Sequence, residues 1–381
     1  MKNGFSLVEL LMATALTIAV TAGVVSLVAP ARAAFSAQPE VASVQQRLRA
    51  TAETVFDDLV MAGAGRLNAS FAPVLPFRRG AVNDAGPGQY KSDTITVYYA
   101  ASTPAETRLA ADLAPGSTAM AIDTDASCRS RIVPCGFTVG TDALVFDAIG
   151  NFERVTVTAV SDSPAVLTVS RPLYATRIFP AGSTVVQAVD RTYFLKRDAT
   201  GAGQLMSYDG STNADLPVVD HVVGLTFEYF GDPRPPALQA TINPPGLRTT
   251  YGPLPPAIDV ESAAYPAGEN CVFRVDLDSG QQVPRLPLLG DGTSALVELT
   301  AADLTDGPWC PDAASPGRWD ADLLRIRKIA VTVRVEAAID RLRGAAGLLF
   351  ARAGTARGAD SWVPDQEIRF QVSPRNLNRD R

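Results

Sequence analysis

Residues 1–35 read MKNGFSLVELLMATALTIAVTAGVVSLVAPARAAF, and this stretch carries most of the information in the sequence. The 20 residues from Leu10 to Ala29 carry no charge. As a helix that rises about 1.5 Å per residue, they would extend about 30 Å, which matches the hydrocarbon core of a bilayer. No second stretch like it follows in the 381 residues. The sequence therefore predicts one membrane-spanning helix, with the rest of the chain on one side of the membrane.

A single carboxylate, Glu9, stands at the head of this apolar stretch. A charge deep in a bilayer costs about 2.5–3.5 kcal/mol on insertion scales, so such a residue usually has a partner. A secretory signal peptide is one alternative, because Ala31-Arg32-Ala33 has the form of a cleavage site. Its apolar region would be longer than the usual length of roughly 7–15 residues, however, and Lys2 is the only cation ahead of it. A plain uncleaved anchor is the other alternative, and it leaves Glu9 equally unexplained.

Gly4-Phe5-Ser6-Leu7-Val8-Glu9-Leu10 resembles the processing site of type IV pilins and type II secretion pseudopilins. In that family a short basic leader ends in glycine, a prepilin peptidase cuts after it, and the new terminal residue is N-methylated. The resemblance implies that residues 1–4 are the leader, that cleavage falls between Gly4 and Phe5, and that Phe5 is methylated. It also implies that Glu9 is the assembly carboxylate.

Cleavage would expose an α-amine at Phe5, and methylation would keep this amine cationic. In an assembly of parallel helices, Glu9 of one subunit would pair with the Phe5 amine of a neighbour. An unpaired buried carboxylate is costly, and pairing removes that cost only where two helices meet in the correct register. We therefore expect Glu9 to select the register of assembly more than to add stability.

The membrane and assembly helix, residues 5–30, is predicted to continue as an amphipathic helix through residues 31–66. Apolar residues recur there at spacings of three and four, which is typical of a helix with one buried face. They are Val41, Val44, Leu48, Ala52, Val55, Leu59 and Ala62. Gly63-Ala64-Gly65 is the predicted end of the helix. Gln46–Arg66 resembles the helix-to-loop passage of PilW-type minor pilins and GspJ-type pseudopilins.

Downstream of the helix, polar and apolar residues alternate as they do in strands with one buried face. The clearest examples are Asp93–Ala100, Leu225–Phe230, Ile329–Glu336 and Glu367–Val372. Asp190–Phe230 resembles the consecutive strands of the PilW-type head. We therefore expect residues 67–104 and 190–381 to form a pilin-like β head, with an antiparallel sheet packed on the helix. The fold class implied is α+β and type IV pilin-like.

Residues 105–189 do not fit that template. Short apolar runs separated by glycine and proline predict strands at Thr118–Asp123, Asp142–Asp147, Glu153–Val160, Ala165–Ser170 and Thr184–Val189. We interpret this region as a small all-β subdomain inserted into the head. A second irregular stretch, Gly231–Gly268, contains nine prolines and is predicted to be an extended surface loop.

The four cysteines form no CxxC pair, which excludes zinc ribbons and thioredoxin-like redox motifs. An even number in a loop-rich sequence suits two disulfides and an oxidising compartment. Three connectivities are possible, and four free buried thiols are the alternative. We favour the local pairs, Cys128 with Cys135 and Cys271 with Cys310, because each is close in sequence.

The sequence shows no pattern that predicts catalysis. It contains no G-x-S-x-G, H-E-x-x-H or Walker A motif, and its single histidine, His221, lies among apolar residues without a nucleophile motif. A formal charge of −6 argues against a nucleic-acid binder, which needs a basic face. We expect no enzyme activity, no cofactor, no metal and no nucleic-acid partner.

These features together predict a structural minor pilin that acts by assembly, in an initiating or tip complex. The resemblance implies a bacterial inner-membrane location with the head in the periplasm, and later a place in a surface pilus. Its implied partners are other pilins through the N-terminal helix, the prepilin peptidase, the inner-membrane assembly platform and a tip adhesin. A pseudopilin of type II secretion or DNA uptake is the first alternative. A membrane-tethered binding domain with a pilin-like anchor is the second.

Overall fold

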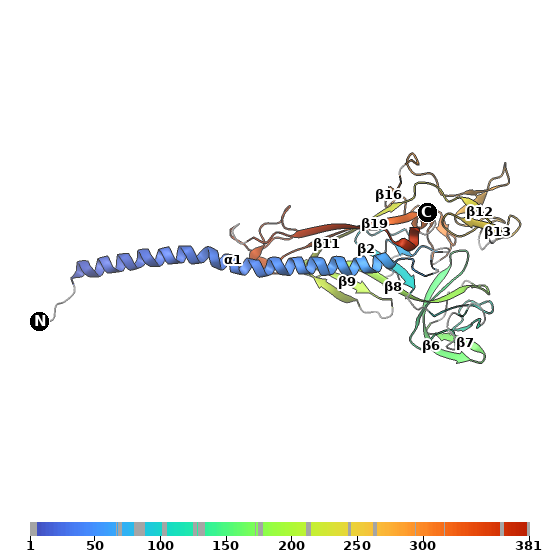
Figure 1. Ribbon diagram of the computed structural model, residues 1–381, viewed down its shortest axis with the longest axis horizontal. Coiled ribbons are helices and arrows are strands. Elements are labelled where there is room, and N and C mark those ends of the chain that lie inside the picture. Colours follow the sequence, from blue (N-terminus) through green and yellow to red (C-terminus); the bar gives the residue numbers. More distant parts are fainter. Residues whose placement is uncertain are drawn as a thin grey trace.

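A long N-terminal helix, α1 (Leu7–Met61), leads into a head built of β-strands, so the fold is α+β (Figure 1). The structure is a computed structural model that describes residues 6–65, 67, 71–79, 88–100, 105–124, 128, 134–171, 173, 178–210, 215–242, 245–261, 265–293, 295–315, 317–358 and 362–378. For residues 27–36 it describes the helical backbone only.

The two helical segments expected from the sequence form one continuous helix of 55 residues. Its first half projects from the head, and its second half lies against the strands (Figure 1). The helix ends where predicted: Ala62 is the C-cap, and its N–H bonds back to the carbonyl of Leu59. Gly63 follows with a φ of 72°, a left-handed conformation that glycine adopts without steric cost. Its N–H then donates to the carbonyl of Tyr98 and joins the helix end to β2 (Thr94–Ala100).

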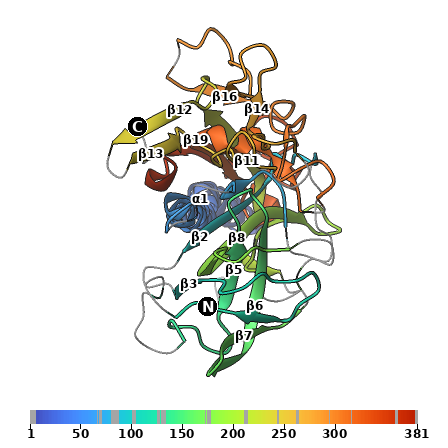
Figure 2. The same cartoon turned by 90° about the vertical axis from the view of Figure 1, so that its right-hand side faces the viewer.

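The second half of α1 buries one face against the head. The predicted apolar stripe is largely confirmed, because Val44, Val55, Leu59 and Ala62 are fully buried. Two polar residues on the same face, Glu40 and Thr51, are also buried, and the apolar pattern did not reveal them. Viewed along its axis, α1 lies between two layers of strands, with β11 and β19 on one side and β2 and β8 on the other (Figure 2).

One layer is an antiparallel sheet of four strands among the described residues. Its strands in spatial order are β16 (Val297–Leu299), β11 (Val222–Gly231), β19 (Ile326–Val335) and β20 (Gln366–Val372). Alternate residues of β11 are buried, as its sequence pattern predicts, and Phe227 pairs with Val331 of β19. Burying one such apolar side chain stabilises the fold by about 1.5–3 kcal/mol.

The other layer is a sheet of ten strands within the described part of the chain. Its main path runs β1 (Val74–Leu75), β2, β8 (Thr184–Arg197), β5 (Asp142–Phe146), β6 (Phe152–Asp162), β7 (Ala165–Val169) and β4 (Ala119–Ala121). Three further strands join at its side: β3 (Glu106–Arg108), β9 (Gly203–Tyr208) and β10 (Leu216–Asp220). Every pairing in it is antiparallel. The predicted strands coincide with β2, β4, β5, β6, β7 and the first part of β8, whereas β1 and β3 were not predicted.

The region expected as an insertion has its own apolar core but shares its sheet with the head. Its core cluster lies entirely between Ala105 and Val185. The expected boundary between residues 189 and 190, however, falls inside β8, which pairs with β5 of the insertion and with β2 and β9 of the head. The 14 residues of β8 therefore join the two parts without a linker.

The sequence predicted that the proline-rich stretch Gly231–Gly268 is an extended surface loop, and this prediction is wrong for part of the stretch. It contains a hairpin of β12 (Leu238–Ile242) and β13 (Pro245–Thr249) that projects from the end of the head far from the free half of α1 (Figure 1). Cross-strand pairing forms this hairpin in spite of Pro245, which stands at the first position of its strand, where a missing N–H is tolerated. The remaining elements are short: β14 (Phe273–Val275), β15 (Gln282–Pro284), β17 (Trp309–Cys310), β18 (Trp319–Asp320), η1 (Ala321–Arg325), η2 (Asp340–Leu342) and η4 (Arg375–Asn378).

Candidate membrane-anchoring and assembly site

The start of α1 is closed by two reciprocal hydrogen bonds between Ser6 and the first turn. Val8 donates its N–H to Oγ of Ser6 at 3.3 Å, and Ser6 donates its N–H to Oε2 of Glu9 at 3.0 Å. This is a capping box, and the S-x-x-E spacing in the sequence is its usual signal. The other oxygen of Glu9, Oε1, makes no hydrogen bond among the described residues. Glu9 thus caps its own helix and still presents one carboxylate oxygen outward.

The two residues assigned to processing, Gly4 and Phe5, lie outside the described residues. The described chain begins at Ser6, and the predicted cleavage between Gly4 and Phe5 lies one residue before it. Because the capping box uses only Ser6 and Glu9, the loss of residues 1–4 would leave it intact.

The first half of α1 buries nothing against its own head. Leu7–Ser26 is a stretch of 20 residues with a mean hydropathy of 2.0, none of it buried, and it is long and apolar enough to cross a membrane. Its hydroxyl groups are satisfied within the helix: Thr17 donates to the carbonyl of Ala13 and Thr21 to that of Thr17, both at 2.7 Å. A helix with apolar residues on all sides and no internal cover has to be surrounded by lipid or by other helices.

The second half of α1 is fastened to the head where it first meets the strands. Glu40 is buried and pairs at 2.6 Å with Arg47, which lies two helical turns later on the same face. The same Oε1 atom accepts the N–H of Ala338, also at 2.6 Å, and Arg47 donates to the carbonyl of Glu336 at 2.9 Å. This polar junction joins α1 to the residues that follow β19, so the head is fixed on the helix at Glu40.

A second buried carboxylate, Glu336, organises the loop beyond that junction. It is wholly buried and pairs with Arg343 at 2.7 Å and with Arg352, whose Nε lies 3.0 Å from each carboxylate oxygen. The Nδ1 atom of His221 lies 3.6 Å from the same carboxylate. Burial alone would raise the pKa of Glu336, but the nearby His221, the hydrogen bonds from Arg352 and the charge of Arg343 hold that pKa down at about 2. His221 therefore stands in a charge cluster, whereas the sequence placed it among apolar residues.

Both local cysteine pairs are disulfides in the structure. Cys128 is joined to Cys135, and Cys271 is joined to Cys310. The second bond is fully buried in the main apolar core of the head. These linkages suit an oxidising compartment.

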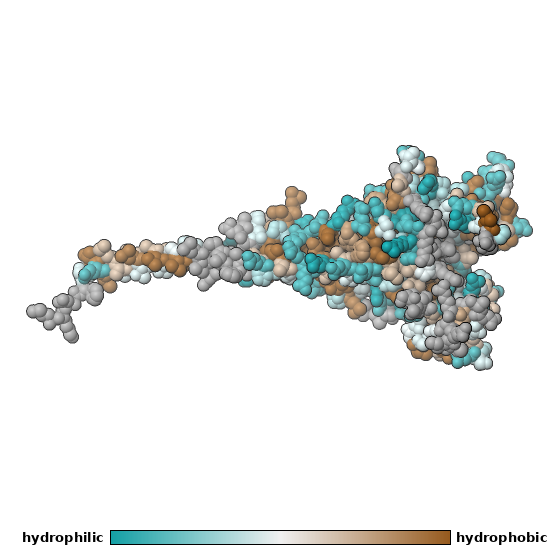
Figure 3. Space-filling view, viewed as in Figure 1, coloured by the Kyte–Doolittle hydropathy of each residue, from teal (hydrophilic) through white to brown (hydrophobic). Residues whose placement is uncertain are grey.

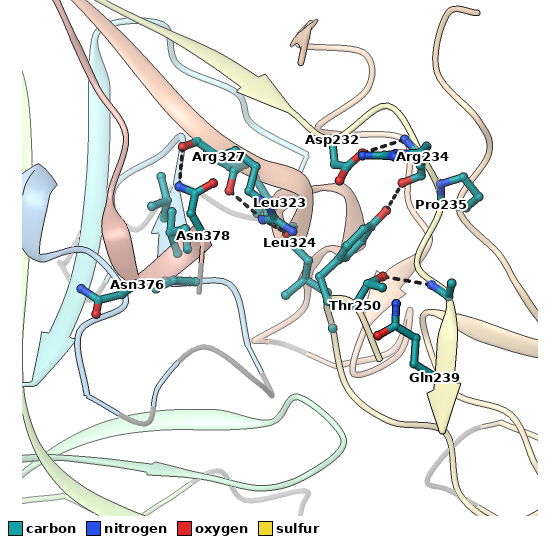
Figure 4. A pocket seen from close by; sticks show the side chains of 17 residues that line it. Asp232, Arg234, Pro235, Gln239, Thr250, Leu323, Leu324, Arg327, Asn376 and Asn378 are labelled. Atoms are coloured by element: carbon teal, nitrogen blue, oxygen red, sulfur yellow. Dashed lines mark hydrogen bonds and ion pairs between the residues drawn. The ribbon is translucent and has the colours of Figure 1, made fainter. Parts of the chain in front are cut away.

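A cavity of about 370 Å³ lies among β12, η1 and η4, and Figure 4 shows the side chains that line it. Tyr251 donates to the carbonyl of Arg234 at 2.7 Å, and the Nε of Arg234 lies 3.3 Å from Asp232. On the opposite wall, Asn378 donates to the carbonyl of Arg327, whose guanidinium donates to the carbonyl of Leu324. The volume is within the range of small-molecule sites, roughly 300–1,000 Å³. These contacts hold the walls of the cavity together, and both of its arginines are engaged within the protein.

One cluster of carboxylates has the spacing of metal ligands. Oxygens of Asp306, Asp320 and Asp322 lie within 4.8 Å of one another. Asp320 caps η1 by accepting the N–H of Asp322, and Asp322 pairs with Arg325 at 2.6 Å. Burial raises the pKa of Asp320 to about 6 and that of Asp322 to about 7. Capping and ion pairing account for the two buried members.

No protein-family model matches this chain, and no curated protein matches it. The features of the molecule itself therefore carry the functional argument. These are an α+β fold, one apolar N-terminal helix compatible with a single-pass anchor, and a disulfide-linked β head fixed on the second half of that helix.

Proposed function

We propose that the chain is a minor pilin, a structural subunit that is held in the membrane by α1 and assembled into a type IV pilus-like filament. The observation that carries this proposal is that the two halves of one continuous helix differ in how they are covered. Leu7–Ser26 is apolar and wholly uncovered, whereas the half beyond Glu40 is docked on the head. A subunit that moves from the membrane into a filament needs an uncovered apolar half. Lipid covers this apolar surface in the membrane, and neighbouring helices cover it in the filament.

The position of Glu9 supports assembly over simple anchoring. A lone anchor gains only the helix cap from a carboxylate at this position, and the charge disfavours insertion. In a bundle of parallel helices, the exposed Oε1 of Glu9 would accept the N-methylated amine of Phe5 from a neighbouring subunit. The head, which is fixed at Glu40, would then be displayed at a defined height on each helix.

The location and partners follow from this proposal. The subunit would be made with the leader 1–4, cleaved by a prepilin peptidase, and held in a bacterial inner membrane with its head in the periplasm. The two disulfides are consistent with such a compartment. Other pilins, an inner-membrane assembly platform and a tip adhesin are the proposed partners, and assembly itself is the function, with no reaction catalysed. A pseudopilin of a secretion or DNA-uptake system would share all of these features.

Two substitutions of Glu9 test the proposal and separate its two roles. Glutamine keeps the capping box, because its amide oxygen also accepts the Ser6 N–H, but it removes the charge. Alanine removes both. We expect Glu9→Gln and Glu9→Ala to be cleaved and folded normally, and both to be lost from filaments sheared from the cell surface.

Incorporation of cleaved Glu9→Gln at the wild-type level would show that Glu9 acts only as a helix cap. If the wild-type protein itself never leaves the membrane fraction, the chain is instead a pseudopilin or a tethered binding domain. Recovery of secretion or of DNA uptake in a deletion strain then distinguishes those two.

A further inference from the structure

The connection between β19 and β20 ends in an apolar tip that nothing in the described chain covers. Residues 344–351 read GAAGLLFA and carry no charge. Leu348 is 98% exposed and Leu349 is 52% exposed, and Trp362 on the returning segment is 36% exposed. Single exposed leucines are ordinary on protein surfaces, but adjacent ones beside an exposed tryptophan form a patch. We call Leu348, Leu349 and Trp362 the apolar tip.

The apolar tip is held in place by the core of the head. Leu348 accepts a hydrogen bond on its carbonyl from Arg334 at 2.9 Å, and Gly347 donates to the carbonyl of Phe350 at 2.9 Å. Phe350 is buried and stacks edge-on against Trp362, with 5.5 Å between ring centroids. A Cβ on Gly344 would come within 2.9 Å of Trp362, so a larger residue here would displace the Phe350 or Trp362 ring. The leucines are therefore displayed on a fixed turn.

The apolar tip lies at the end of the head nearest the free half of α1. Its connection begins at the junction of Glu40 with Ala338, and Figure 3 shows apolar side chains standing off the head on this side. From Arg32, the first charge after the apolar stretch, to Glu40 is eight residues, or about 12 Å of helix. The headgroup layer takes up roughly 5–8 Å of that height. Membrane helices tilt by about 20° on average and by up to about 40°, and a tilt toward this side brings the apolar tip closer to the surface.

The flanking charges suit an anionic surface. Between residues 336 and 358 the chain has four arginines against Glu336 and Asp340. Arg343 and Arg352 neutralise Glu336, and Arg343 also pairs with Asp340. Arg341 and Arg357 are exposed and make no ion pair among the described residues. An apolar tip bordered by free cations has the chemistry of a protein surface that rests on anionic lipid, although the chain as a whole carries −6.

We propose that the apolar tip docks on the surface of the bilayer that α1 spans, with its leucines among the acyl chains and Arg341 and Arg357 at anionic headgroups. This inference rests on the proposed membrane anchoring. The contact would set the tilt of the head before assembly, and it would have to be released when the subunit leaves the membrane.

Lipid-borne quenching in reconstituted vesicles tests the contact. The full-length protein with its disulfides is placed in vesicles of phosphatidylethanolamine and phosphatidylglycerol. A fluorophore is attached to one introduced cysteine at a time: Leu348→Cys in the apolar tip, Leu16→Cys in the span, and Leu277→Cys as the matched control. Leu277 is 97% exposed on the turn between β14 and β15, away from the membrane half of α1. We expect spin-labelled lipid to quench the Leu348 probe several-fold more than the Leu277 probe.

The other outcomes each overturn a distinct statement. If the Leu16 probe is quenched and the Leu348 and Leu277 probes are quenched equally little, the membrane anchoring by α1 is supported and the lipid contact of the apolar tip is refuted. No quenching at Leu16 would refute the anchor and, with it, the contact. If the Leu348 probe is shielded from both lipid-borne and aqueous quenchers only at high protein density, a neighbouring subunit covers the apolar tip, and the lipid proposal is wrong.

Discussion

Tyr193 donates a hydrogen bond to Oδ2 of Asp58, with 2.6 Å between the oxygens. Tyr99 donates to the other oxygen of the same carboxylate at 2.7 Å. One helical carboxylate thus joins α1 to two neighbouring strands, β8 and β2. Burial and the adjacent carboxylate raise the pKa of both phenols, so both remain donors across the physiological range.

Replacing Asp58 should loosen the last turns of α1 from the ten-stranded sheet. We expect Asp58→Ala to lower the free energy of unfolding by about 2–3 kcal/mol, because it leaves two part-buried phenols without their charged acceptor. Asp57, the exposed neighbour, is the control, and Asp57→Ala should change stability by less than about 0.5 kcal/mol. Urea unfolding of the detergent-solubilised protein measures both. Equal stabilities of the two variants would contradict the joining role of Asp58.

The two disulfides should differ in their contribution to stability. The cysteines of the pair Cys271–Cys310 are 39 residues apart in the sequence, whereas those of Cys128–Cys135 are 7 apart. In the chain-entropy model these loops correspond to about 4 and about 2–3 kcal/mol. We therefore expect the double serine variant of Cys271 and Cys310 to unfold at lower urea than that of Cys128 and Cys135. Non-reducing peptide mapping of the native protein should recover the same two pairs, and crossed pairs or free thiols would contradict the assignment.

The parts of the fold that follow from local periodicity were predictable from the sequence. The 3.6-residue stripe located the docked face of α1, and alternation located the ends of β2, β11, β19 and β20 within three residues. A stripe of apolar residues predicts a buried helix face without any knowledge of what packs on it. Alternation of polar and apolar residues likewise predicts a half-buried strand. The end of the helix at Gly63 followed from the same kind of local signal.

Features set by contacts between distant residues were not predictable in this way. Glu40 is buried because Ala338, nearly 300 residues later, bonds to it. β8 continues across the expected domain boundary because strands on both sides pair with it, and the hairpin of β12 and β13 forms within a stretch that its prolines marked as loop. The capping box of Ser6 and Glu9 differs from these features, because its S-x-x-E spacing is a local signal in the sequence.

Cleavage of the native protein should fall between Gly4 and Phe5. The leader, the apolar helix and Glu9 stand together as a prepilin peptidase requires, and the capping box begins only at Ser6. Mass spectrometry of protein from the source membrane should give N-methyl-Phe5 as its first residue. A first residue at Ala34 would mean that residues 1–33 are a secretory signal and that the chain has no anchor of its own.

The buried ion cluster around Glu336 gives a prediction that depends on pH. Glu336→Gln keeps the shape of the side chain but leaves Arg343, which is almost wholly buried, without its main counter-charge. Breaking a buried pair by removing one partner typically costs about 3–5 kcal/mol, and we expect a loss of that order at pH 7. Glu367→Gln, on the exposed side of β20, is the control and should lose less than about 0.5 kcal/mol.

The sign of the pH dependence follows from the lowered pKa of Glu336. Its pKa is about 2 in the folded protein against an ordinary value of 4.5, so the unfolded chain binds a proton there before the folded protein does. The stability that the charged form contributes is therefore fully present above about pH 4.5 and is lost as the pH falls toward 2. Chemical unfolding between pH 7 and pH 3 should show the gap between wild type and Glu336→Gln narrowing toward the acid end, while the Glu367→Gln gap stays near zero. A gap that keeps its size down to pH 3 would mean that the variant is destabilised by altered packing, and that the charge of Glu336 does not hold Arg343, Arg352 and the loop that they support.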